Sequence, residues 1–223
     1  MFSDNVLIIF VKYPRAGFVK TRLAKEIGRK NASELYRLFV KTILSRIKDK
    51  NFTRVIFYSP ASKRNEIKRW LGGEILYPQK GKDLGERLLA AFRLTFQKGA
   101  KKVVAIGTDS PALNKKLVLD AFEKLKDTEC VLGPAFDGGY YLVGLSSFYK
   151  EIFQHIDWGS YNVFKQTLGT IKKLRVRFSL LEKVLDIDNK DDLLNFCRQL
   201  PKIYKANPIG LTPIIKFLEQ LFS

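Results

Sequence analysis

Short runs of apolar residues alternate along this chain with longer segments in which apolar residues recur at helical spacing. Short apolar runs bounded by turn residues are typical of buried strands, and their alternation with helices indicates an α/β sandwich with a mostly parallel sheet. The runs expected to form strands are Val6–Val11, Val55–Ser59, Ile75–Tyr77, Val103–Gly107, Cys130–Pro134 and Tyr140–Leu145.

Two helices are marked by their apolar stripes and by cap signals. The first covers Leu35 to Ile47, with Asn31 and Glu34 spaced as a capping box. The second starts at the cap pair Asp83 and Glu86 and carries a continuous apolar stripe. Further helices are expected at Asn114–Lys126, Ser160–Leu168, Lys190–Leu200 and Pro213–Phe222.

Length and composition favour a single globular domain. The 223 residues, 46% hydrophobic and 28% charged, hold no apolar run near the roughly 20 residues that span a bilayer. We expect residues 1–200 to form the domain, and residues 201–223 to form a connector and an amphipathic helix packed on it. The first strand begins without the pattern of a secretory leader, which predicts a cytoplasmic protein without membrane insertion.

Charged groups other than histidine must carry any chemistry. The chain has one histidine and two cysteines without paired spacing, which argues against an imidazole base, a zinc site or a disulfide framework. The net charge of +18 attracts anions in general. Because the basic residues are scattered, nucleic-acid binding is not favoured over a solvated basic surface. The oligomeric state is open, with a homodimer among the alternatives.

The first candidate site follows the first strand, in the segment Lys12–Arg22. Gly17 and a proline impose a turn, and Lys20, Thr21 and Arg22 then place two cations beside backbone N–H groups at a helix start. The segment lacks the glycine frame of a Walker A loop. We predict that it holds the diphosphate of a nucleotide-type substrate; the alternative is a basic surface turn.

A second candidate is Asp109, at the end of the strand that begins at Val103. Ligands of open α/β sheets bind beyond the carboxyl ends of strands. Because Ser110 and Asn114 are available to cap the following helix, Asp109 is free to meet a divalent cation bridging phosphate oxygens. The alternative is that Asp109 is itself the cap.

Two further carboxylate segments lie at strand ends. Asp137 precedes Gly138 and Gly139, which form either a hairpin turn or a place where the backbone passes close to a ligand. At the end of a second buried strand, Asp137 could face Asp109. Asp186 and Asp188 are candidate metal ligands, ahead of a helix capped by the following asparagine.

The order of these motifs resembles a bacterial family of uncharacterised glycosyltransferase-A-like proteins, some of them described as glycosyltransferases of arsenosugar biosynthesis. The most specific elements are Lys-Thr-Arg-Leu, Gly-Thr-Asp-Ser-Pro, Gly-Pro-Ala-x-Asp-Gly-Gly-Tyr-Tyr-Leu and Trp-Gly-Ser. The resemblance spans roughly residues 5 to 195 and implies a three-layer α/β/α sandwich of the nucleotide-diphospho-sugar transferase fold. It also implies kinship with 2-phospho-L-lactate guanylyltransferase and molybdopterin nucleotidyltransferases.

The resemblance implies roles for these residues. Asp109 would be the first ligand of a Mg²⁺ or Mn²⁺ ion and Asp188 the second, while Lys20 and Arg22 would clamp the phosphates. Asp137 with its two glycines would face the sugar or the acceptor. The phosphate-binding set also includes Lys12, Gly17, Thr21 and Arg87, and the substrate-binding set comprises Ser110, Gly138, Gly139 and Tyr140. The first loop departs from the glycine-rich loop of sugar nucleotidyltransferases, so the phosphate part of the likeness is stronger than the base-binding part.

Three functions remain open at this stage. The favoured one is a glycosyltransferase that takes a nucleoside-diphosphate sugar and a small-molecule acceptor, with Asp109, Asp137 and Lys20 as catalytic residues. A nucleotidyltransferase acting on a phosphorylated small molecule would use the same residues. A non-catalytic anion-binding or nucleic-acid-binding module would instead show salt-sensitive, metal-independent binding.

Overall fold

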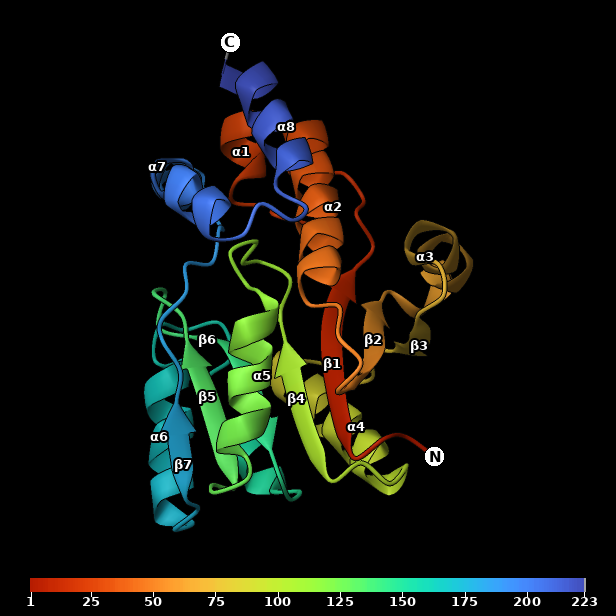
Figure 1. Ribbon diagram of the computed structural model, residues 1–223, viewed down its shortest axis with the longest axis vertical. Helices are drawn as coiled ribbons and strands as arrows, with labels where there is room; N and C mark the ends of the chain where they lie inside the picture. Colours follow the sequence, from red (N-terminus) through yellow and green to blue (C-terminus); the bar gives the residue numbers. More distant parts are fainter. Residues whose placement is uncertain (223) are drawn as a thin grey trace.

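The computed structural model describes residues 1–222, and within them seven strands form one sheet in the order β3-β2-β1-β4-β6-β5-β7 (Figure 1). Among the described strands, every neighbouring pair is parallel except the two pairs that include β6. The predicted mostly parallel sheet is therefore confirmed. The strands are β1 (Asn5–Lys12), β2 (Thr53–Ser59), β3 (Ile75–Pro78), β4 (Lys102–Ile106), β5 (Cys130–Pro134), β6 (Tyr140–Leu145) and β7 (Phe178–Leu180).

Helices cover both faces of the sheet, which gives the three-layer α/β/α arrangement. One apolar core packs α2, α3 and α5 on one face, and a second packs α4, α6 and the short helix η2 on the other. The helices are α1 (Ala24–Ile27), α2 (Arg29–Arg46), α3 (Arg64–Leu71), α4 (Leu84–Gln97), α5 (Lys115–Lys124), α6 (Val163–Lys173), α7 (Lys190–Ala206) and α8 (Thr212–Phe222), with 3₁₀ turns η1 (Ala61–Lys63) and η2 (Lys150–Phe153). None of the helices in residues 1–222 has the length and apolar character needed to cross a membrane.

A third apolar core joins the last two helices to α1 and α2. In it Phe39 of α2 meets Phe196 of α7, with ring centroids 6.3 Å apart, and Ile214 and Leu218 of α8 are buried. Figure 1 shows α7 and α8 beside α1 and α2, beyond the carboxyl ends of the strands. The helix α8 thus packs on the remainder of the described chain.

Three expectations about elements were wrong in detail. Asn31 lies inside α2 and its amide donates to the Ile27 carbonyl, because Gly28, at φ +85°, starts α2 earlier than the predicted capping box. α6 begins at Val163 rather than at Ser160, because residues 158–162 form a loop over the cleft. α7 continues through Pro201, where the connector was expected, since Leu200 and Ile203 still pack in the third core. The Asp83 cap is confirmed: its Oδ1 accepts from the Glu86 N–H at 2.8 Å.

The direction of β6 sets the position of the site. Strand β6 runs antiparallel to β4 and β5, so its first residue lies at the same edge of the sheet as the last residues of β1, β4 and β5. The N–H of Gly107, just beyond β4, donates to the Tyr141 carbonyl at 3.1 Å. The turn that precedes β6 is thereby held beside the loop that follows β4.

Candidate active site

A cleft of about 760 Å³ opens at this edge of the sheet. Segments that are distant in sequence meet there: the end of β1, the loop before α1, the end of β4, the turn before β6 and the strand-to-helix segment before α7. The predicted site residues among those that line it are Lys12, Lys20, Thr21, Arg22, Arg87, Asp109, Asp137, Gly139, Tyr140, Asp186 and Asp188.

Three predicted residues do not line the cleft but belong to the segments that form it. Gly17, at φ +81°, makes the turn of the first loop. Ser110 is buried and hydrogen bonds with the segment before α7. Gly138, at φ +88°, lies beneath Tyr161. The structure therefore places these three as supports of the cleft wall.

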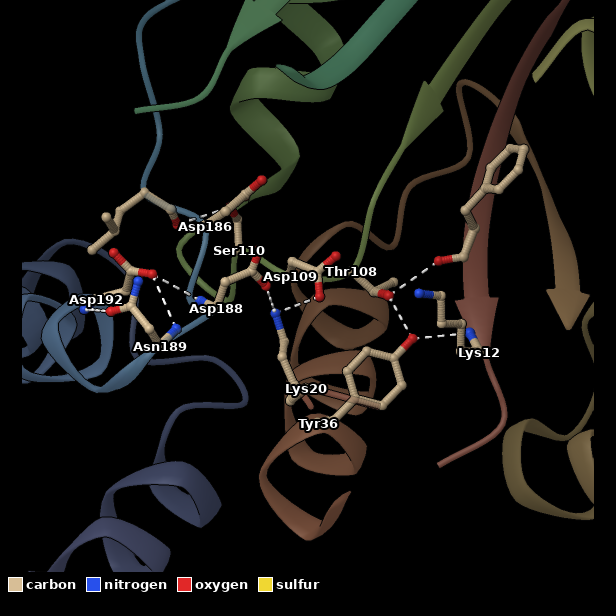
Figure 2. Close-up of polar contacts among 12 residues, drawn as sticks. Lys12, Lys20, Tyr36, Thr108, Asp109, Ser110, Asp186, Asp188, Asn189 and Asp192 are labelled. Atoms are coloured by element: carbon tan, nitrogen blue, oxygen red, sulfur yellow. Dashed lines mark hydrogen bonds and ion pairs between the residues drawn. The ribbon is translucent and has the colours of Figure 1, made fainter. Parts of the chain in front are cut away.

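Lys20 joins two of the predicted aspartates. Its Nζ lies 2.5 Å from Oδ1 of Asp109 and 2.9 Å from Oδ1 of Asp188 (Figure 2). The Lys20 side chain is 2% exposed, whereas the two carboxylates are 44% and 41% exposed. The Lys20 ammonium group is thus shielded from solvent, whereas both aspartates remain partly exposed to solvent.

The charges of this trio perturb one another. Burial would lower the pKa of Lys20, but the adjacent Asp109 and Asp188 more than offset it, and the pKa is raised above its ordinary value. Burial would likewise raise the pKa of Asp188, yet the charge and hydrogen bond of Lys20 lower it. Lys20 therefore stays protonated and Asp188 stays ionised at neutral pH.

A hydrogen-bonded chain ties α2 to the ends of β1 and β4. The Thr108 hydroxyl donates to the Phe10 carbonyl at 3.0 Å, so its oxygen accepts from the Tyr36 hydroxyl at 2.9 Å. Tyr36 in turn accepts from the backbone N–H of Lys12 at 2.9 Å. Burial, with the nearby charge of Asp109, raises the pKa of Tyr36 to about 12, which keeps it a donor. These bonds hold Thr108, the residue before Asp109, against α2 and the end of β1.

Ser110 anchors Asp186 beneath the cleft. The Ser110 hydroxyl contacts both the Leu185 carbonyl, at 2.9 Å, and Oδ1 of Asp186. Because a hydroxyl donates one proton, Ser110 can satisfy both contacts only if Asp186 is the donor in one of them. Burial, and after it the charge of Asp109, raises the pKa of Asp186 to about 7, which agrees with a shared proton. Of the two candidate ligands in this segment, Asp188 is the one with the stable negative charge.

The start of α7 holds Asp188 in place through a capping box. Oδ2 of Asp192 accepts from the backbone N–H of Asp188 at 3.0 Å and from that of Asn189 at 3.1 Å, while the Asn189 side chain accepts from the Asp192 N–H (Figure 2). A further bond from the Ile187 N–H to the Asp109 carbonyl, at 3.1 Å, fixes this segment to β4. The two aspartates are therefore positioned by backbone contacts and not only by Lys20.

The turn before β6 also lines the cleft. Oδ1 of Asp137 accepts from the Gly139 N–H at 2.9 Å, which makes the turn compact. The Gly138 carbonyl accepts from the Phe164 N–H at 2.9 Å, and a Cβ added at Gly138 would lie 2.0 Å from the Tyr161 carbonyl oxygen. The predicted hairpin is confirmed, and within it Gly138 serves packing while Gly139 lines the cleft. Asp137 nevertheless lines the same cleft as Asp109, and both carboxylates act electrostatically on Asp186.

Sequence reasoning assigned no role to four residues of the cleft. Tyr36 and Gln79 are typical core and loop residues by sequence; the Gln79 amide caps the carbonyls of Val11 and Phe57. Trp158 packs so closely on α4 that a Cβ at Gly85 would lie 2.1 Å from its Nε1. Tyr161, 79% exposed, lies over the turn before β6. The Trp-Gly-Ser motif was the available signal for the last two.

The carboxylates of the cleft fit a divalent ion that is completed by a ligand. Within residues 1–222 no group of three or more histidine, cysteine, aspartate or glutamate side chains is arranged as a metal site by itself. Mg²⁺ in proteins is commonly held by one or two carboxylates together with substrate phosphates. Asp109 and Asp188, both partly exposed to the cleft, match that donor set.

The sheet order and the cleft at the carboxyl ends of its strands define the class: the chain has the nucleotide-diphospho-sugar transferase fold. It belongs to the bacterial family described as "Uncharacterized protein conserved in bacteria (DUF2064)", whose sequence profile matches residues 42–160. This confirms the family resemblance noted in the sequence. None of the curated proteins compared with the chain matches it.

Solved structures agree with this class. A crystal structure from Desulfovibrio desulfuricans G20, provisionally described as a nucleotide-diphospho-sugar transferase, is 33% identical, with a TM-score of 0.91 over 98% of this chain and 96% of that one. A cytidylyltransferase from Leptospira borgpetersenii is 15% identical, with a TM-score of 0.57 over 92% and 95%. A manganese complex of a Mycobacterium tuberculosis H37Rv protein is 13% identical, with a TM-score of 0.55 over 88% and 99%. The last two share the fold.

Proposed function

We propose that the chain is a nucleotide-dependent transferase, and that its reaction is glycosyl transfer from a nucleoside-diphosphate sugar to a small-molecule acceptor with Mg²⁺ or Mn²⁺. The observation that carries the proposal is the meeting of Asp109 and Asp188 with the cations Lys12, Lys20 and Arg22 in one cleft. Cations beside a carboxylate pair are the arrangement that a metal-bound diphosphate requires.

In this reaction the chain's own residues bind and orient the substrates. Lys12, Arg22 and Arg87 line the cleft and would stabilise the negative charge that develops on the departing diphosphate. A divalent ion held by Asp109 and Asp188 would add charge stabilisation at the same phosphate oxygens. Lys20, Thr21 and Gly17 complete the loop that carries these cations.

We assign the acceptor to the part of the cleft lined by the turn before β6 and by Tyr161. Asp137 uses Oδ1 to hold the turn, which leaves Oδ2 to orient or deprotonate an acceptor hydroxyl. The exposed ring of Tyr161 and the backbone of Gly139 and Tyr140 border the same part of the cleft. An acceptor that lies against an aromatic ring and offers a hydroxyl to a carboxylate fits this part of the cleft.

Nucleotidyl transfer is the second candidate. It is favoured by the pair of carboxylates, since two metal-binding aspartates suit attack on an α-phosphate with pyrophosphate as the leaving group. The product separates the two reactions: free nucleoside diphosphate identifies sugar transfer, whereas pyrophosphate released from a nucleoside triphosphate identifies nucleotidyl transfer.

The test of both is a thermal-shift panel of nucleotides and sugar nucleotides with and without Mn²⁺, followed by product analysis of the ligands that bind. Asp109→Asn should abolish the metal-dependent shift. Asp127→Asn, an exposed aspartate in the loop after α5, removes the same charge as a matched control and should preserve the shift. If no nucleotide stabilises the wild-type protein under any metal condition, the proposed function is wrong.

A further inference from the structure

The Lys20 ammonium group lies between the carboxylates of Asp109 and Asp188, the two negative charges that a bound metal ion would need. It contacts Oδ1 of both Asp109 and Asp188, and its side chain is nearly inaccessible to solvent. A lysine is a compact point charge on a flexible stem, so it can exchange one anionic partner for another. Lys20 therefore has two sets of anions within its reach in this cleft: the aspartates and any phosphate that enters.

Lys20 and a divalent ion compete for the same two charges. With Lys20 in place, Asp109 and Asp188 together carry one net negative charge, and one oxygen of each is already engaged. A metal ion on the remaining oxygens would lie close to the ammonium group, and like charges at such separations repel strongly inside a protein. Asp186 is poorly placed to add a further carboxylate oxygen for the metal ion, because its Oδ1 contacts Ser110.

We propose that Lys20 is an internal counterion that keeps metal off Asp109 and Asp188 until a diphosphate enters the cleft and draws its ammonium group away. The proposal rests on the proposed function only in taking a diphosphate as the ligand. Lys12 and Arg22 line the same cleft and bring the diphosphate within reach of Lys20. Metal and diphosphate then bind as a coupled pair, and each raises the affinity for the other by the same factor.

Mn²⁺ binding by the full chain tests this directly, read from the loss of the free-ion paramagnetic resonance signal. Lys20→Met removes the charge with little change in volume and should tighten the binding of Mn²⁺ alone by about tenfold or more. Lys25→Met is the matched control, because Lys25 is an exposed lysine at the adjacent α1 and its loss changes the net charge equally. That control should stay within about twofold of wild type.

The coupling is measured with inorganic pyrophosphate as the base-independent probe. Added pyrophosphate should tighten Mn²⁺ binding by wild type about tenfold more than it does by Lys20→Met, because only wild type has an ammonium group to displace. Pyrophosphate also chelates Mn²⁺ in solution. This effect is the same in both titrations, so it cancels when the change in wild type is divided by the change in Lys20→Met. Lys20→Arg keeps the charge and should bind Mn²⁺ alone as weakly as wild type does.

The outcomes are distinct. Tighter Mn²⁺ binding by Lys20→Met, with Lys25→Met unchanged, supports the proposal. Equal or weaker Mn²⁺ binding by Lys20→Met overturns it, as does tight Mn²⁺ binding by wild type that pyrophosphate does not strengthen. If Lys20→Met does not fold by circular dichroism, wild type and Lys20→Arg still decide, because tight binding of Mn²⁺ alone by either contradicts the role of counterion. The Mn²⁺ arm uses no nucleotide, so the proposed function can fail separately.

Discussion

Gly138 packs the turn before β6 tightly against residues 161–164, and Gly138→Ala should be strongly destabilising. The added Cβ would lie 2.0 Å from the Tyr161 carbonyl oxygen, where atoms normally approach no closer than 3.0 Å. The obstacle is backbone and not a flexible side chain. Residues 161–164 would have to move by about 1 Å, which also disturbs the bond from the Phe164 N–H to the Gly138 carbonyl.

The magnitude follows from three contributions. An alanine at φ +88° costs about 1–2 kcal/mol in strain. Overpacking against fixed backbone costs about 1–3 kcal/mol. Weakening a backbone hydrogen bond adds about 0.5–1.5 kcal/mol. Together these contributions amount to about 2.5–6.5 kcal/mol. Because local relaxation recovers part of the upper end, we expect Gly138→Ala to lower the free energy of unfolding by about 3–5 kcal/mol.

Gly159 supplies a control in the loop that carries Tyr161. It also has a positive φ, +111°, but nothing lies within 4 Å of an added Cβ. Gly159→Ala thus measures the strain without the clash and should cost about 1–2 kcal/mol. Equilibrium denaturation with urea, fitted with a common slope, gives both values. A difference under about 0.5 kcal/mol between the two variants would refute the steric argument, since that is the size of ordinary surface effects.

Two other predictions concern the supports of the carboxylate pair. Tyr36→Phe removes the hydroxyl between Lys12 and Thr108 and should lower the free energy of unfolding by about 1–3 kcal/mol in urea titrations; an effect no larger than that of the half-exposed Tyr204→Phe would contradict it. Asp192→Ala removes the acceptor for two backbone N–H groups and should cost about 1–2 kcal/mol and weaken Mn²⁺–pyrophosphate binding. Its neighbour Asp191→Ala, which loses only a helix-dipole contact, should cost at most about 1 kcal/mol, and equal costs would argue against the capping box.

Much of the fold was predictable because its signals are local. The strands β5 and β6 were predicted at their observed bounds, and Asp83 and Asn189 cap helices as expected, since apolar runs and cap residues act over a few positions. The short edge strand β7 was missed because a three-residue strand carries too little pattern. The Asn31 cap failed because the φ of +85° at Gly28 was not visible in the sequence.

That several of the candidate residues come together in one cleft was predictable, and their pairing was not. Asp109 and Asp137 closely follow strands and Lys20 lies in the loop after β1, and ligands of such sheets bind beyond the strand ends, so these positions favoured all three. That Lys20 would be buried between Asp109 and Asp188 depends on a contact between residues 168 positions apart and on the capping box at α7. Tyr36 is a stripe residue of α2 by sequence, and only the packing of α2 on β1 reveals its hydroxyl as a link.

The overall charge and the local charge of the cleft oppose each other, and together they favour one kind of ligand. A net charge of +18 draws any anion toward the surface. The lining of the cleft, however, includes the carboxylates of Asp109, Asp137 and Asp188, which a bare phosphate must approach at an electrostatic cost. An anion accompanied by a divalent cation meets both conditions, because its phosphates face Lys12 and Arg22 while its metal faces the carboxylates. A simple anion-binding module would need the cations but not the carboxylates. The carboxylates are the reason why the proposed function is a metal-dependent transferase.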